Sequence, residues 1–136
     1  MFRYIVVSLV SGILFGVMDG AINANPLAQK LYEVYQPIAR TSLNVVAGSL
    51  IDLAYGFILA AIFLVIYEGL PGHSGIQKGF SYAILVWFLR VVMYAASTWI
   101  MYKVPIQTIG YGLFAGLIEM LVLGILFGVT LKPLGR

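Results

Sequence analysis

Four long apolar windows restrict what this chain can fold into more than any other feature of its sequence. A helix needs about 20 apolar residues to cross the hydrocarbon layer of a membrane. Membrane-barrel strands instead alternate polar and apolar residues over about 10 positions, and these windows are continuous. We predict an all-α integral membrane protein, one domain over residues 1–136, built as a four-transmembrane-helix bundle with spans at about 4–20, 45–67, 80–102 and 109–131.

The composition agrees with lipid as the solvent and restricts the possible chemistry. The chain is 62% hydrophobic and 10% charged, against about 25% charged residues in an ordinary soluble domain. It has no cysteine, and its single histidine, His73, lies in a glycine-rich loop, so neither a His/Cys metal site nor a Ser-His-Asp triad can be assembled. We expect no enzyme activity, no metal and no cofactor, and no basic tract suggests nucleic acid.

The segment from about 26 to 38 differs from the four spans. Asn25-Pro26 is typical of a helix start, and apolar residues then recur at helical spacing at Leu27, Leu31, Val34 and Ile38. Tyr32 and Tyr35 suit a membrane–water boundary. We predict a short interfacial amphipathic helix between the first two spans. The alternative is a cap packed over the mouth of the bundle.

The remaining connections are short, which predicts antiparallel neighbouring helices. Residues 68–75 are rich in turn formers, and Pro105 ends the third span. The first window follows Met1-Phe2-Arg3 as a signal peptide core would, but we expect it to be retained as a span.

The loop charges favour both termini in the cytoplasm and an inner (cytoplasmic) membrane location. Four basic residues lie on the side of the termini and three on the other side. They are Arg3, Lys78, Lys132 and Arg136 against Lys30, Arg40 and Lys103.

Small residues recur every four positions in the spans. Such spacing places them on one helix face and lets helix backbones approach closely. The pattern does not distinguish contacts within the chain from contacts between chains. We therefore expect a homo-oligomer or a larger membrane complex, with the lipid bilayer as a constant partner. The runs are Gly12/Gly16/Gly20, Gly112/Gly116 and Gly124/Gly128.

Charged residues inside the spans are the main functional signal. Arg90 and Glu119 fall near the middle of their spans, and Asp52 lies toward the first-loop side of its own. Each such charge costs about 2.5–3.5 kcal/mol to insert near a helix centre. We expect Arg90 to bridge the two carboxylates, with Tyr55 and Tyr94 completing their hydrogen bonds. Glu119 lies deeper than Asp52 and is the expected proton carrier.

Asp19 and Asn23 are expected at the mouth of this site, although both also suit an ordinary solvated helix end. The charge cluster has two interpretations. Intramembrane ionisable residues mark binding or proton relay, whereas a buried ion-pair network can also fix helix register.

Three functions follow from these interpretations. The sequence slightly favours a non-catalytic accessory or ligand-binding subunit of a membrane assembly. The alternative is a small oligomeric proton-coupled transporter or channel for a small or anionic solute, which needs oligomerisation because four spans are few for a transporter. A lipid-binding role for the amphipathic first loop is the third.

Overall fold

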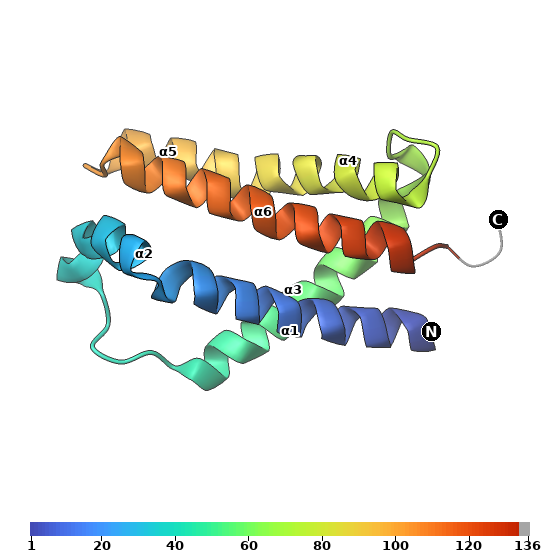
Figure 1. Ribbon diagram of the computed structural model, residues 1–136, viewed down its shortest axis with the longest axis horizontal. Coiled ribbons are helices and arrows are strands. Elements are labelled where there is room, and N and C mark those ends of the chain that lie inside the picture. The colour runs from blue at the N-terminus through green and yellow to red at the C-terminus, as the bar shows by residue number, and fades with distance from the viewer. Residues whose placement is uncertain (134–136) are drawn as a thin grey trace.

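The chain is helical through most of residues 1–133, which are the residues that the computed structural model describes. Four of its helical rods are long and apolar enough to cross a membrane, which confirms that part of the prediction. No strand occurs among the described residues. In chain order (Figure 1) the elements are α1 (Phe2–Ala24), α2 (Pro26–Leu31), η1 (Tyr32–Ile38), α3 (Val45–Ile66), η2 (Tyr67–Gly69), α4 (Gly75–Trp87), η3 (Phe88–Val92), α5 (Met93–Met101) and α6 (Ile106–Thr130).

Three of the four rods begin before their apolar windows, and polar residues cap the start of the third. The third rod begins at Gly75 rather than near residue 80. Ser74 and Gln77 form a capping box there, in which the Ser74 hydroxyl accepts from the Gln77 backbone N–H at 3.2 Å. The third rod ends at Met101, before Pro105, and Pro105 is the N-cap residue of α6, which begins at Ile106 and not near residue 109.

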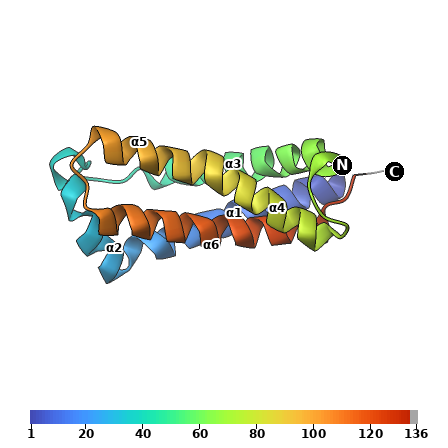
Figure 2. The same cartoon turned by 90° about the horizontal axis from the view of Figure 1, so that it is seen from above.

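The helices form two pairs that meet at an angle. The rod made of α4, η3 and α5 runs antiparallel to α6, whereas α3 crosses α1 (Figures 1 and 2). Contacts between α1 and α6 join the two pairs. The start of α1 and the end of α6 lie at the same end of the molecule, as four antiparallel crossings require.

Glycine lets the backbones of α4 and α6 touch. A methyl group at Gly79 would clash with the carbonyl oxygen of Gly124, and one at Gly75 would clash with that of Gly128. Backbone contact of this kind gives close packing between apolar helices without a hydrophobic driving force. The Gly124/Gly128 run is therefore used within the chain.

The crossing of α1 and α3 also depends on small residues. A methyl group at Gly56 would lie 2.6 Å from the backbone nitrogen of Gly12, and one at Gly12 would lie 2.8 Å from the Cα of Leu53. In contrast, methyl groups at Gly20 and Gly112 would have no described atom within 4 Å. The predicted runs thus contain both packed and unpacked glycines.

An aromatic cluster joins α3 to the α4–α6 pair near the end that holds the start of α1. The Phe63 ring lies 5.2 Å from the Tyr82 ring and 5.8 Å from the Phe127 ring, measured between centroids. The buried Tyr82 hydroxyl donates a 2.6 Å hydrogen bond to the carbonyl oxygen of Leu59. At the other end, the start of α3 lies away from α5 and α6 (Figure 1).

The segment 26–38 is two short helices, an α-helix followed by a 3-10 helix, rather than the single helix expected. Its start is as predicted, because the Asn25 side chain accepts from the backbone N–H of Ala28 at 2.9 Å. Ala28 is fully buried, and the Thr108 hydroxyl donates a 2.7 Å hydrogen bond to the carbonyl oxygen of Leu31. These contacts hold the segment against α6.

Candidate functional site

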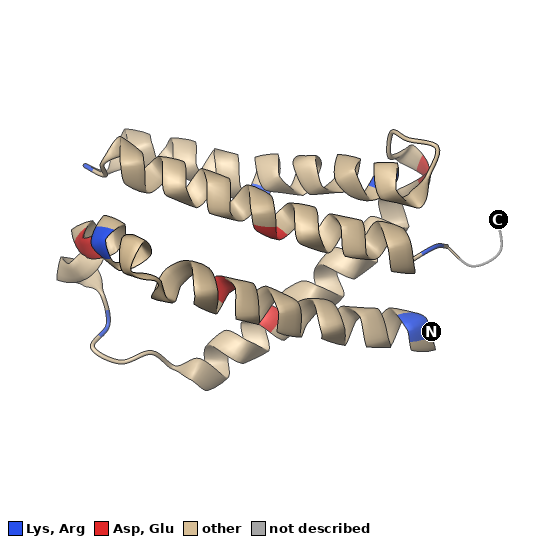
Figure 3. Cartoon of the chain, viewed as in Figure 1, with Lys and Arg blue, Asp and Glu red and all other residues tan. Residues whose placement is uncertain are grey.

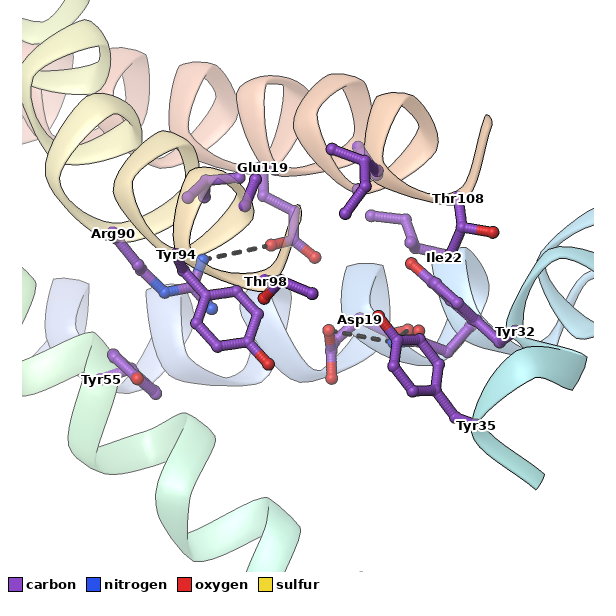
Figure 4. A pocket seen from close by; sticks show the side chains of 17 residues that line it. Asp19, Ile22, Tyr32, Tyr35, Tyr55, Arg90, Tyr94, Thr98, Thr108 and Glu119 are labelled. Carbon is purple, nitrogen blue, oxygen red and sulfur yellow. Dashed lines mark hydrogen bonds and ion pairs between the residues drawn. The ribbon is translucent and has the colours of Figure 1, made fainter. Parts of the chain in front are cut away.

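A cavity of about 530 Å³, lined by charged, phenolic and apolar side chains, lies between the two helix pairs, at the end of the molecule that α2 and η1 cover. Its walls come from the C-terminal part of α1, from η1, from Tyr55 of α3, from η3 and α5, and from α6 (Figure 4). Pockets for small molecules span roughly 300–1,000 Å³. The space therefore suits a small ligand.

Arg90 and Glu119 form the innermost charged pair that lines this cavity. An Arg90 guanidinium nitrogen, Nη1, lies 3.7 Å from Oε2 of Glu119. This separation makes the contact an ion pair and not a hydrogen bond. The Glu119 side chain is only 6% exposed, whereas that of Arg90 is 31% exposed, so the carboxylate is the more deeply placed of the two charges.

Two aromatic rings lie against the Arg90 guanidinium. Its central carbon lies 5.0 Å from the ring centroid of Phe15 and 5.1 Å from that of Tyr55. A guanidinium so placed is attracted by the electron-rich ring faces. Tyr55 thus supports Arg90 through its ring, whereas the sequence suggested a hydrogen bond from its hydroxyl to a carboxylate.

A π-helical turn positions Arg90. Residues Phe88–Val92 form this turn, designated η3, in the middle of the α4–α5 rod. The wider turn inserts one residue into the helical repeat, and such insertions are frequent at functional sites. Downstream of it Thr98 is buried and Ser97 is exposed, whereas an uninterrupted α-helix would place Ser97, seven residues after Arg90, on the same face as Arg90.

Asp19 and Asn23 line the cavity on the α1 side, the region in which the sequence places the mouth of a site. The Asn23 side-chain amide donates to the backbone carbonyl of Asp19 at 2.8 Å and to its carboxylate at 3.2 Å. Asn23 thereby orients the carboxylate one helical turn before it. In Figure 4 Asp19 lies between Arg90 and the tyrosines of η1.

Asp52 is placed differently from Glu119. It lies against Gly16 of α1, where a methyl group would come within 2.9 Å of the Asp52 Oδ2. Among the described residues no ion pair joins Asp52 to Arg90, so the expected bridge of one guanidinium to two carboxylates is not formed. Asp52 stands beside the cavity without lining it.

Four tyrosines surround the open part of the cavity. Tyr94, a predicted site residue, lines it from α5, and Tyr55 lines it from α3. Tyr32 and Tyr35 of η1 also line it, although the sequence suggests only a membrane-boundary role for them. Burial raises the pKa of both η1 hydroxyls. Tyr32 and Tyr35 are three residues apart on a helical segment, which places them on one face, and this spacing could have indicated that they line the same site.

Two polar side chains of α6, which the sequence did not predict as site residues, hold neighbouring segments against the cavity walls. The Tyr111 hydroxyl donates a 2.6 Å hydrogen bond to the carbonyl oxygen of Ile22 and accepts one of 2.8 Å from the Asn25 amide. Thr108, which lines the cavity, binds the carbonyl oxygen of Leu31. Neither residue carries a charge. Neither therefore stands out in the sequence through a cost of insertion into lipid, as Arg90 and Glu119 do.

The chemistry available in the cavity is that of carboxylates, one guanidinium and phenols. Within residues 1–133 no three His, Cys, Asp or Glu side chains lie close enough together to hold a metal ion. No known protein family, curated protein or solved structure matches this chain. The arrangement of charges and rings around an open space is suited to binding a small molecule.

Proposed function

We propose that this protein spans a membrane four times and binds a small molecule in the cavity beside Arg90 and Glu119, without catalysing a reaction. The observation that carries the proposal is a space of about 530 Å³ with an ion pair on its wall, of which the carboxylate is buried and the guanidinium partly exposed. Intramembrane ionisable residues facing a cavity mark ligand or ion pathways. An ion pair that served only helix register would not need such a space beside it.

The outer surface supports the membrane part of the proposal. Large apolar side chains are exposed on each of the four long helices, among them Val17 at 64%, Val65 at 82%, Leu89 at 62% and Phe114 at 66%. A water-soluble protein does not expose apolar residues so widely. Lipid chains would cover these side chains.

We propose the cytoplasmic membrane as the location, with both termini in the cytoplasm. Apart from the charges in the middle of the bundle, Lys and Arg lie toward its two ends (Figure 3). Arg3, Lys78 and Lys132 belong to the end that holds the start of α1, and Arg136, which falls outside the described residues, adds a fourth basic residue to that side of the sequence. The basic excess on this side supports the orientation. In that orientation η1 covers the cavity from the opposite side of the membrane.

The packed glycines bear on the proposed partners. The accessory-subunit hypothesis uses glycine faces to dock another protein, but Gly12, Gly56, Gly79 and Gly124 pack within this chain. Binding of a small molecule is therefore the function that the geometry favours. Assembly into an oligomer and transport of the bound molecule stay predictions.

A cavity-filling substitution tests the proposal. Gly112 lines the cavity, and a methyl group there would meet no described atom within 4 Å, so Gly112→Phe fills the space without displacing a helix. Gly110 is equally open but does not line the cavity, which makes Gly110→Phe the matched control. Each protein is purified gently in lipid nanodiscs and its bound small molecules are identified by mass spectrometry.

We expect a small molecule to copurify with the original chain and with Gly110→Phe. The same molecule should be absent from purified Gly112→Phe. Circular dichroism and size-exclusion chromatography verify that all three proteins fold alike. Equal content of the same small molecules in all three folded proteins, or none in any of them, would overturn the proposal.

A further inference from the structure

The charges and rings of the cavity point to one class of ligand. We infer that the cavity binds an organic cation, a molecule that carries an ammonium group on an apolar body. The inference rests on the proposed function, because it names the ligand class of the same cavity.

Negative charge exceeds positive charge around this space. Asp19 and Glu119 line the cavity and Asp52 stands beside it, whereas Arg90 is the one cation among its described lining residues. If one of the three carboxylates is protonated, an excess of one negative charge still remains. Charges act more strongly in a poorly solvated site than in water, so the cavity attracts a cation.

Glu119 keeps capacity for a ligand. The residue is 4% exposed overall and its carboxylate points into the cavity (Figure 4). Its contact with Arg90, at 3.7 Å, is longer than a hydrogen bond. A partly unpaired carboxylate in a site of low solvation gains from a positive charge a few ångströms away, and an ammonium group supplies that charge whether or not it carries an N–H.

Arg90 is less suited to capture an anion. Phe15 and Tyr55 stack on its guanidinium, and Glu119 already lies beside it. An anion approaching Arg90 would also meet the carboxylates of Asp19 and Glu119. The sequence suggested a small or anionic solute, and the charges that surround Arg90 favour the opposite sign.

The aromatic lining favours an organic cation over a metal ion. Tyr32, Tyr35, Tyr55 and Tyr94 contribute to the wall, and aromatic ring faces attract ammonium groups that have shed water. The described residues offer no set of three acidic or histidine ligands for a metal. Ile22, Val91 and Ile109 supply apolar surface for the body of the ligand.

Three probes of similar shape test the sign of the charge. Phenyltrimethylammonium is a cation, tert-butylbenzene is its neutral counterpart and benzenesulfonate is an anion. Their binding to the full chain is measured by isothermal titration calorimetry in a neutral detergent. The same titration with Gly112→Phe subtracts partitioning into the micelle.

We expect saturable binding of phenyltrimethylammonium alone. Asp19→Asn should weaken it by roughly tenfold, since it removes a carboxylate without changing the shape of the side chain. Glu68→Gln removes a charge from η2, in the connection between α3 and α4, which does not line the cavity, and should leave the affinity unchanged. If Asp19→Asn does not fold, Tyr35→Leu replaces it, and we expect binding several-fold weaker.

Five results would overturn the inference. Preferential binding of benzenesulfonate, or equal binding of all three probes, would refute a cation site. Failure of every probe to bind folded protein would also refute it, as would unchanged affinity in the cavity variants. The molecule that copurifies with the original chain and not with Gly112→Phe tests the proposed function separately, so a copurified anion would refute the inference alone.

Discussion

Tyr111 of α6 and Ile22 of α1 are joined by a 2.6 Å hydrogen bond from the phenol to the backbone carbonyl. The bond ties α6 to the part of α1 that lines the cavity, and the same hydroxyl accepts from Asn25 just before α2 begins. One side chain thus fixes the end of α1, the start of α2 and the first part of α6 relative to one another.

Tyr111→Phe should lower the free energy of unfolding by about 1 kcal/mol, the typical net contribution of one hydrogen bond. Loss of the hydroxyl should also speed amide hydrogen exchange at the end of α1. Tyr102→Phe is the control, because Tyr102 is 62% exposed. Equal stability of the two variants in denaturant titration would contradict the role given to Tyr111.

Gly79→Ala should lower the free energy of unfolding by about 1–3 kcal/mol, the usual cost of overpacking. The added methyl group clashes with a backbone oxygen of Gly124, and a backbone atom cannot rotate away as a flexible side chain can. Gly110→Ala, in open space on α6, should not lower it. Reversible unfolding in mixed micelles measures both, and a stable Gly79→Ala protein would refute the contact.

Arg90 and Glu119 should be energetically coupled. Breaking a buried pair costs about 3–5 kcal/mol, and the 31% exposure of the Arg90 side chain reduces our expectation for Arg90→Met to about 2 kcal/mol. The double variant with Glu119→Gln should lose less than the sum of the two single variants, by about 1 kcal/mol. Strict additivity in the double-mutant cycle would show that the pair is not an energetic unit.

Alkaline pH should weaken the attachment of η1. Desolvation by burial, followed by the nearby Tyr111, raises the pKa of Tyr32 above its ordinary 10.0. The folded state therefore holds this proton more tightly than the unfolded state does, and stability is full below pH 10 and falls as the pH rises through the raised pKa. Tyr32→Phe should unfold with a weaker dependence on alkaline pH, whereas Tyr102→Phe should behave as the original chain.

Much of the fold follows from local patterns. The apolar windows predict four long helices because length and apolarity are properties of single segments, and Asn25-Pro26 predicts the start of α2 from its immediate neighbours. The division at Tyr32 between α2 and the 3-10 turns was not predicted. The spacing of Leu27, Leu31 and the residues beyond suits one helix, whereas Pro37, which has no backbone N–H to donate, lies inside the 3-10 part and opposes a continuous α-helix.

The candidate site was less predictable because it depends on relations between helices. The cost of a charge in lipid draws attention to Arg90, Glu119 and Asp52, but the position of Asp52 beside Gly16 depends on the angle at which α3 crosses α1. The π-helical turn at Arg90 shifts every later residue of that rod by one position. Such a shift leaves no mark in an apolar sequence, so Thr98 was not expected on the inward face.

The two glycine contacts differ in what they permit. Between α4 and α6 the backbones touch at two successive turns, which leaves little freedom for sliding or tilting. Between α1 and α3 the tightest approach is at Gly56, near the middle of α3, so these two helices are held closest where they cross. A change in the angle of this crossing would move the N-terminal half of α3, which carries Asp52, relative to the frame formed by α4, α5 and α6.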